Sequence, residues 1–594
     1  MIFQVIRSHY TNNKTMVYLF SIFILLFLSE TVLSFYFASP FRLPDEVEYF
    51  TKAAAVFHSH NFFASPPWGN TFPGYPIVLS IFFGISQSPL LIYHLLLIFN
   101  AGLVSLTVFP IYYILSEYCS EKISLIGTII VATLPNIIVY PFSVVSENFF
   151  IPLLIFSSWF FVEYYKTSSK FFSFLLGLTL IILTLSRPTG FVTALSFFIV
   201  LFFTKSADFS KPRKVTAIVS FLAISAITCV LLTYLVINGT LYLSGYNVSE
   251  FLKDTLHLIG AKEFFFLVFS RFLFQVEYLV LSGYCIFFLL AGLLFISLFY
   301  SQWVTRAVKF NLTGNLDAPH ARSLKAFALY ILFVSVPLIL ITTCFLLDSS
   351  AAPASQQIDI YGRYLDPIVP LFFIFGIISL ALLFEHIKRP GSFFFSIIAG
   401  SALSMSILFI LTFPFISNNN YILWSILPIG YILVIKNILP LGLFIAILFI
   451  GFTLFFISGF YSNKIKYTFF IAIIILSIFI NGIAIGTELS LSTYWDSQNQ
   501  IGKFLSENSN ENSVTIIDLN SAGDRTYIWL SLFLVKGSVI NVGLSQKNTL
   551  NLAFPVKNID YIISSKNLDY PAVGFDNSNG GFTLYVLNTT SQSL

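Results

Sequence analysis

The first 488 residues of this chain consist of long apolar runs that are separated by short polar stretches. Runs of roughly 20 apolar residues have the length of a helix that crosses a bilayer. By this criterion we expect about thirteen membrane spans. They fall near residues 16–37, 88–115, 123–142, 146–164, 171–187, 189–204, 215–237, 277–302, 326–347, 365–385, 392–414, 438–460 and 467–487. The pattern of residues 1–488 therefore predicts a polytopic α-helical membrane protein.

One further apolar segment, Tyr421 to Lys436, is short for a span and contains Pro428 and Gly430. If it crosses the membrane, the chain has about fourteen spans and its C-terminal region lies in the cytoplasm. If it lies on the outer surface or re-enters it, the count stays at about thirteen. Lys464 and Lys466 then lie inside. We prefer the lower count, because cytoplasmic loops are enriched in lysine and arginine.

Residues 489–594 show a different pattern, in which turn residues separate short runs rich in β-branched and aromatic residues. These runs are Val514–Asp518, Ser538–Val542, Tyr561–Ser564 and Phe582–Leu587. Helical stretches near 496–507 and 524–535 fall between them. Because strands and helices alternate here, we expect a small α/β domain.

The basic residues decide the orientation of the spans. With the N-terminus inside, the cytoplasmic segments hold many more lysines and arginines than the outer loops, as such loops usually do. These residues are Arg7, Lys14, Lys122, Lys166, Lys170, Lys205, Lys211, Arg213, Lys214, Arg306, Lys309, Arg322, Lys325, Lys388, Arg389, Lys464 and Lys466. We expect an integral, multi-pass plasma-membrane protein with a cytoplasmic N-terminus and an extracytoplasmic C-terminal domain. The first apolar run lacks a small-residue cleavage site, so we interpret it as a retained anchor.

Composition narrows the classes of partner. Hydrophobic residues make up 57% of the chain and charged residues only 10%, which indicates burial in lipid rather than in a soluble core. The net charge of +4 is small and scattered, so we expect a lipid bilayer as a partner and no nucleic acid. The four cysteines stand singly beside apolar runs, which indicates packing: Cys119, Cys229, Cys285 and Cys344.

Three acids, Asp45, Glu46 and Glu48, stand just beyond the first span. Acids held beside a bilayer usually mark a site, because keeping them there is costly. Pro44 suits the first turn of a helix, so we expect a helix from Asp45 to about His58. The acids then lie at its positive end.

The first outer loop, residues 38–87, contains these acids. Glu48 can pair with Lys52 four residues later on the helix, so we interpret Glu48 as an ordinary helix residue. Phe72–Pro76 opens a second, apolar helix of about 12 residues, which is too short to span and which we expect along the membrane surface.

Four motifs on the outer face form a set. They are Asp45-Glu46 with Tyr49 and the Pro-rich helix start after it, Ser146-Glu147, Ser186–Gly190 and Tyr361–Pro367. In order, spacing and side of the membrane, the set resembles the GT-C glycosyltransferases, and within them the protein O-mannosyltransferase and aminoarabinose-transferase group. The resemblance covers about residues 16 to 390. It implies transfer of a sugar from a polyprenyl-phosphate carrier to a protein, lipid or glycan acceptor, with inversion at the anomeric carbon.

This resemblance implies roles for the site residues. A single displacement needs one carboxylate to take the acceptor's proton. Asp45 is the candidate base and Glu46 the alternative; neighbouring helical residues point about 100° apart, so the two acids would not share one task.

Two arginines suit the leaving phosphate, because a guanidinium forms bidentate hydrogen bonds with such an anion. Arg363 is the first candidate, with Tyr364 as a hydrogen-bond partner of the phosphate, and Arg187 is the second.

Glu147 is a candidate for positioning the acceptor or for holding a divalent metal. His58 and His60 lie in the same outer loop, but histidines two apart do not share a helical face and no third ligand is evident. We therefore name no cofactor with certainty, and the identity of any metal stays unknown.

Two other classes of protein have a similar number of spans. A secondary transporter would place ionisable residues at mid-membrane and often shows repeated halves. A membrane receptor with an outer ligand-binding domain would not explain why Asp45, Glu147 and Arg363 gather on one side. The enzyme interpretation explains this arrangement.

Overall fold

We describe the computed structural model over a defined part of the chain. The described residues are 13–37, 43–61, 72–86, 88–203, 242–243, 246–247, 264–283, 286–299, 318–348, 362–386, 400, 463–493, 496–509, 513–518, 538–542, 559–564, 568, 571–573 and 583–587. The expected spans at 215–237, 392–414 and 438–460, the segment Tyr421 to Lys436, and the expected helix at 524–535 lie outside them.

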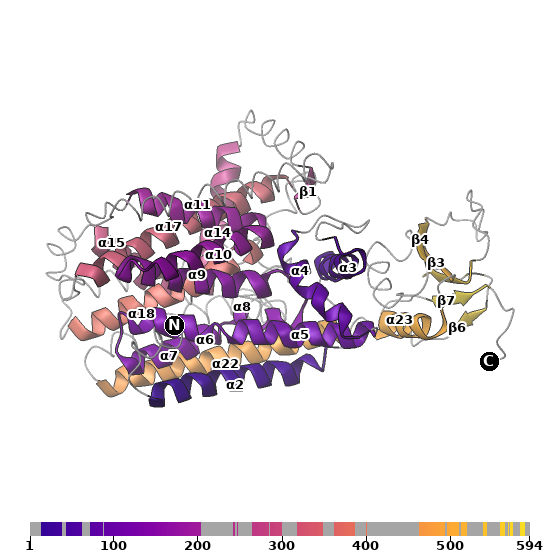
Figure 1. Ribbon diagram of the computed structural model, residues 1–594, viewed down its shortest axis with the longest axis horizontal. Coiled ribbons are helices and arrows are strands. Elements are labelled where there is room, and N and C mark those ends of the chain that lie inside the picture. The colour runs from indigo at the N-terminus through magenta and orange to yellow at the C-terminus, as the bar shows by residue number, and fades with distance from the viewer. Residues whose placement is uncertain are drawn as a thin grey trace.

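Long helices form the bulk of the molecule and lie side by side (Figure 1). They are α2 (Asn13–Ser34), α5 (Pro89–Ser105), α6 (Val108–Ser116), α7 (Glu121–Ala132), α9 (Glu147–Thr167), α10 (Lys170–Ser186), α11 (Pro188–Phe203), α14 (Phe264–Ser282), α15 (Ile286–Phe299), α17 (Ala318–Asp348), α18 (Val369–His386) and α22 (Asn463–Thr493). Among the described residues, five helices are long and apolar enough to cross a membrane, or up to seven if two bent pairs each count as one span. The chain is a multi-pass membrane protein, and the count of about thirteen spans stays a prediction.

Both bent pairs differ from the straight spans that we expected. The run expected at 123–142 forms α7 and then a segment at Pro135–Phe142 that is turned by 59°. Pro135, the first residue after the break, explains the turn, because proline has no N–H for a continuing helix. The span expected at 277–302 consists of the end of α14 and of α15, at an angle of 104°.

Helix α9 occupies the core and contacts α5, α6, α10 and α17. Phe161 on α9 stacks against Tyr330 on α17 with ring centroids 5.0 Å apart. Helices α2 and α22 instead expose large apolar side chains, including Leu25, Val32, Ile475 and Phe479. A broad exposed apolar surface suits lipid rather than water.

The described part of the expected first outer loop forms short helices that pack on the bundle. Helix α3 (Leu43–Ser59) confirms the helix expected from Asp45 to about His58. Helix α4 (Gly74–Ser80) continues into η1 (Ile81–Gly84), which together form the expected short apolar helix. Tyr75 of α4 lies buried between Tyr49 and Phe149, with ring centroids 5.5 and 5.9 Å away.

The C-terminal region contains a five-stranded sheet. Its strands are β3 (Val514–Asp518), β4 (Ser538–Val542), β5 (Tyr561–Ser564), β6 (Ala572–Val573) and β7 (Thr583–Val586), in the order β4-β3-β5-β7-β6. Strands β4, β3 and β5 are parallel, and the pairs β5–β7 and β7–β6 are antiparallel. Helix α23 (Asp496–Asn508) packs Ile501 and Leu505 onto this sheet, which lies at one end of the molecule (Figure 1). Each of the four expected β-rich runs forms a strand.

Candidate functional site

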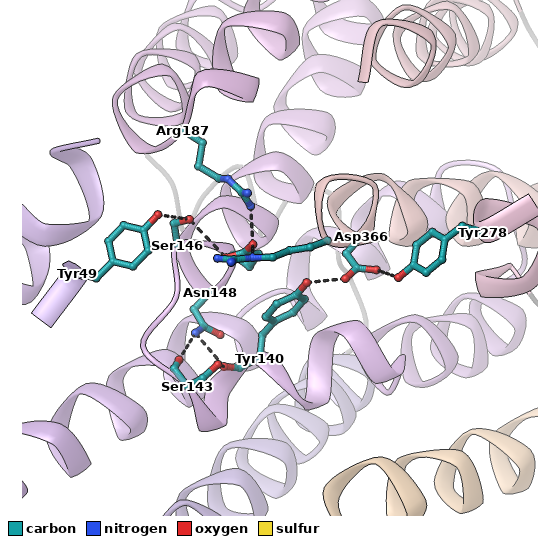
Figure 2. A network of polar contacts seen from close by, with 10 residues as sticks. Tyr49, Tyr140, Ser143, Ser146, Asn148, Arg187, Tyr278 and Asp366 are labelled. Atoms are coloured by element: carbon teal, nitrogen blue, oxygen red, sulfur yellow. Dashed lines mark hydrogen bonds and ion pairs between the residues drawn. The ribbon is translucent and has the colours of Figure 1, made fainter. Parts of the chain in front are cut away.

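A buried polar segment begins where the bent helix pair ends. After α8 (Pro135–Ile138) and η2 (Tyr140–Phe142), the chain runs without helix until Glu147 opens α9. The side-chain amide of Asn148 donates to the carbonyl oxygens of Tyr140 and Ser143, at 2.9 and 2.7 Å (Figure 2). The Tyr140 carbonyl also accepts from the Ser143 N–H, and the Ser143 carbonyl also accepts from the Asn100 amide, so side chains supply much of the hydrogen bonding of this segment.

Glu147 is completely buried at the first turn of α9, where the helix dipole favours a negative charge. Its carboxylate binds two arginines that come from distant parts of the chain. Arg187 Nη1 lies 2.8 Å from Oε1, and Arg363 Nη2 donates to Oε2 at 3.0 Å while Arg363 Nε contacts Oε1. Two positive charges thus share one carboxylate, and the Arg363 contact is bidentate.

Arg187 stands at the turn between α10 and α11, with extended backbone and Pro188 starting the next helix. Its guanidinium lies 5.3 Å from the ring centroid of Tyr364 and 5.9 Å from that of Phe150. Such distances are typical of cation–π contacts. Tyr364, expected as a hydrogen-bond partner of a phosphate, therefore packs against the second arginine.

Arg363 comes from η4 (Gly362–Tyr364), which leads through η5 (Asp366–Ile368) into α18. Asp366 is completely buried, and its carboxylate accepts hydrogen bonds from Tyr140 at 2.5 Å and from Tyr278. Its backbone carbonyl accepts from the Asn136 amide at 2.7 Å. This network ties the Arg363 turn to the bent segment and to α14.

Sequence reasoning missed the roles of Asn136, Tyr140, Tyr278 and Asp366. One signal was available, because Asp366 is an acid at the start of an expected span and such residues are rarely without function. Nothing in the sequence indicated that tyrosines about 88 and 226 residues away would bind it, as the structure shows.

Helix α3 contacts the same segment through two of its side chains. Glu46 is completely buried, and its Oε2 accepts from the Val144 N–H at 2.8 Å and from the Tyr93 hydroxyl at 3.2 Å. Tyr49 donates to the Ser146 hydroxyl at 2.9 Å. Asp45 is the third residue of α3, but its side chain lies outside the described residues, so its role as the base stays a prediction.

Lys52 behaves differently from a surface residue. Its side chain is buried, and burial lowers the pKa of its ammonium group to about 8, although the nearby Glu48 carboxylate raises it. The Glu48 carboxylate therefore attracts the Lys52 ammonium group, as expected. Unlike a surface lysine, however, Lys52 is largely shielded from water.

Glu147 does not fit a divalent cation in this arrangement. Both of its oxygens face arginines, which repel a cation. His58 and His60 are exposed. Across the described residues, no group of three or more His, Cys, Asp or Glu side chains is arranged to hold a metal ion.

No known family model matches the sequence, and no curated protein matches it. The structure is similar to that of ArnT from Cupriavidus metallidurans bound to undecaprenyl phosphate, with a TM-score of 0.51 and 11% sequence identity over 96% of this chain and 98% of that one. It is also similar, at a TM-score of 0.42 and 10% identity, to the Archaeoglobus fulgidus oligosaccharyltransferase, covering 91% of this chain and 69% of that one. The chain has the GT-C fold that its motifs predict.

Proposed function

We propose that this protein is an inverting glycosyltransferase that moves a sugar from a polyprenyl-phosphate carrier to an acceptor at the outer membrane face. One observation carries this proposal. Arg187 and Arg363 converge on a single buried carboxylate, Glu147, next to the helix that bears Asp45 and Glu46. The likeness of the whole chain to ArnT, a protein whose structure contains undecaprenyl phosphate, agrees with this.

The arginine pair suits an anionic leaving group. A guanidinium has five N–H donors, so it can hold a carboxylate along one edge and a phosphate along another. Two such groups in a site shielded from water would stabilise the charge that develops on the phosphate. We assign this task to Arg363 and Arg187, with Tyr364 holding the second guanidinium against its ring.

Glu147 would then act on the arginines. We assign it to orienting both guanidinium groups, in place of the acceptor or metal contact that we expected from the sequence. Without this carboxylate, two like charges would lie close together in a buried site, which is unfavourable.

The reaction balances as a single displacement. The acceptor oxygen attacks the anomeric carbon while the Asp45 carboxylate takes its proton, and the bond from that carbon to the phosphate oxygen breaks. The electron pair of this bond leaves with the phosphate, which the arginines stabilise. Because attack and departure occur on opposite faces, the anomeric configuration inverts. The acceptor is a protein, a lipid or a glycan, and the C-terminal sheet region would face it from outside.

A transfer assay tests this proposal. Membranes containing the protein receive radiolabelled polyprenyl-phosphate sugars and a panel of acceptors. We expect Asp45→Asn to lower transfer at least about 100-fold, because general acid–base catalysis typically contributes about 100- to 10,000-fold. The matched control is Glu48→Gln, which changes an acid on the same helix and should leave transfer unchanged.

Three outcomes decide between interpretations. Unchanged transfer in a folded Asp45→Asn protein would show that the base is another group. Loss of transfer in Arg363→Lys, which keeps the charge but not the fork of donors, would support phosphate recognition. Solute uptake that survives Asp45→Asn, with no sugar transfer by the wild type, would favour a transporter.

A further inference from the structure

Glu46 has the contacts of an anchor. Its side chain is completely buried, and one carboxylate oxygen accepts two hydrogen bonds, from the Val144 N–H and the Tyr93 hydroxyl. Val144 belongs to the non-helical segment just before α9, where its amide has no helical partner. Glu46 thus supplies an acceptor to a buried backbone donor that would otherwise be costly.

The anchored segment leads directly to the arginine pair. Val144 precedes Glu147 by three residues, and Glu147 holds Arg187 and Arg363. On the other side of the contact, Glu46 follows Asp45 on α3, and consecutive Cα atoms are only about 3.8 Å apart. The hydrogen bond between Glu46 and Val144 therefore joins the neighbour of the proposed base to a residue that lies three positions before Glu147.

A second connection runs parallel to the first. Tyr49, one turn after Glu46 on α3, donates to the Ser146 hydroxyl, and that hydroxyl lies 3.4 Å from Glu147 Oε2. Residues three apart lie on neighbouring positions of a helix, so Glu46 and Tyr49 face the same segment.

Helix α4 contacts the segments that lead to Arg187 and to Glu147. A Cβ on Gly74, the first residue of α4, would lie 2.8 Å from the backbone carbon of Leu185, two residues before Arg187. Tyr75 donates to Asn100, whose amide donates to the Ser143 carbonyl. Both outer-loop helices therefore contact the backbone that carries Glu147 and Arg187.

We propose that Glu46 is a positioning residue that sets the spacing between Asp45 and the arginine pair by fixing α3 to the Val144–Glu147 segment. Its task is to accept hydrogen bonds, not to take the acceptor's proton. The inference rests on the proposed function for its effect on turnover, but its structural part can be measured without activity.

The first measurement separates an acceptor of hydrogen bonds from a base. Glu46→Gln keeps an oxygen that can accept from Val144 and Tyr93, so we expect turnover within about 3-fold of the wild type. Glu46→Leu removes that oxygen, and we expect kcat to fall about 10- to 100-fold with the donor KM within 2-fold, because misplacement by about 1 Å can have such an effect. Tyr49→Phe should lower kcat by a smaller factor. Glu48→Gln is the control on the same helix.

The second measurement follows amide hydrogen exchange in peptides that cover residues 140–148. We expect exchange there to be at least about 10-fold faster in Glu46→Leu, and unchanged in Glu46→Gln and Glu48→Gln, because only the leucine leaves the Val144 amide without its acceptor. This readout needs only folded protein, and Glu46→Gln and Tyr49→Phe remain informative if Glu46→Leu does not fold.

The outcomes test the positioning role of Glu46 separately from the proposed glycosyltransferase function. If Glu46→Gln abolishes transfer but keeps wild-type exchange, Glu46 is needed for its charge or proton, and the proposal is overturned. If Glu46→Leu changes neither turnover nor exchange, there is no anchor. If the exchange pattern holds but the wild type transfers no sugar from any donor, the anchor stands and the proposed function fails.

Discussion

Glu147 shows how one residue can organise a site from distant segments. Its carboxylate is removed from water, which is unfavourable by several kcal/mol for a lone ion. Arg187 and Arg363 offset this through short, charge-assisted contacts at its two oxygens. The carboxylate and the guanidinium groups thus depend on one another, and removing the carboxylate takes away the buried counter-charge that both arginines share.

We therefore expect Glu147→Gln to lower stability by about 3–5 kcal/mol, the usual effect of breaking a buried ion pair. Thermal unfolding in detergent would measure it. Glu507→Gln, at an exposed position on α23, is the control and should change stability by less than about 0.5 kcal/mol. If the two variants behave alike, Glu147 does not hold the arginines.

Gly362 stands where Tyr278 leaves no room for a larger side chain. A Cβ at this position would overlap the ring of Tyr278, whose hydroxyl binds Asp366. Tyr278 would have to move, and the Arg363 turn would lose its connection to α14.

For Gly362→Ala we expect a loss of about 1–3 kcal/mol, as for other overpacked positions. The proposed binding of phosphate by Arg363 and Arg187 should weaken together with the free energy of unfolding. Gly292→Ala provides the matched control, because a Cβ there meets nothing within 4 Å and α15 gains a better helix former. Equal effects of both substitutions on unfolding would contradict the proposed overlap.

At the scale of elements, the break between α7 and α8 determines where the site lies. The helix ends at Ala132, and the chain turns before Pro135. A broken helix within a membrane needs other partners for its free carbonyl groups. Asn481 on α22 supplies one, since its side-chain amide donates to the Thr133 carbonyl at 2.6 Å. Helix α22 is otherwise largely apolar and packs on both α7 and α8, so this hydrogen bond ties it to the break.

Replacing Asn481 with leucine should therefore destabilise the protein by about 1–3 kcal/mol, because the Thr133 carbonyl loses its donor in a buried place. The change is measurable as a lower unfolding temperature in detergent. Ile475→Leu, on the exposed face of the same helix, is the comparison and should have little effect. A stable Asn481→Leu protein would indicate that another group satisfies this carbonyl.

At the scale of the whole molecule, a GT-C fold persists at 11% identity to ArnT over nearly the full length of both chains. Lipid-facing positions accept many apolar residues, so the same arrangement of helices tolerates very different sequences. In this chain a small set of buried polar contacts joins segments that are far apart in the sequence. A shared fold does not by itself fix function, which depends on the residues of the site.

The orientation in the membrane gives a prediction at this scale. In a protein without its four native cysteines, single cysteines at Ser59, Lys122 and Lys503 occupy exposed positions on α3, α7 and α23. A membrane-impermeant maleimide should label positions 59 and 503 in intact cells and position 122 only after permeabilisation. Labelling of position 503 only after permeabilisation would instead support the count with one more span.

Within the described residues, the apolar runs by themselves determined where most of the long helices lie, since the length of a hydrocarbon core and the need to satisfy backbone groups leave few alternatives. Pro44 and the acids after it indicated helix α3, and short runs rich in β-branched residues indicated the strands near the C-terminus. The motifs brought Glu147, Arg187 and Arg363 under consideration. Only the tertiary structure decided that these three side chains meet, that Asp366 binds Tyr140 and Tyr278, and that Glu46 is buried against Val144. The reason is physical: hydropathy acts locally along the chain, whereas a buried ion pair or hydrogen bond depends on how bent and neighbouring helices pack.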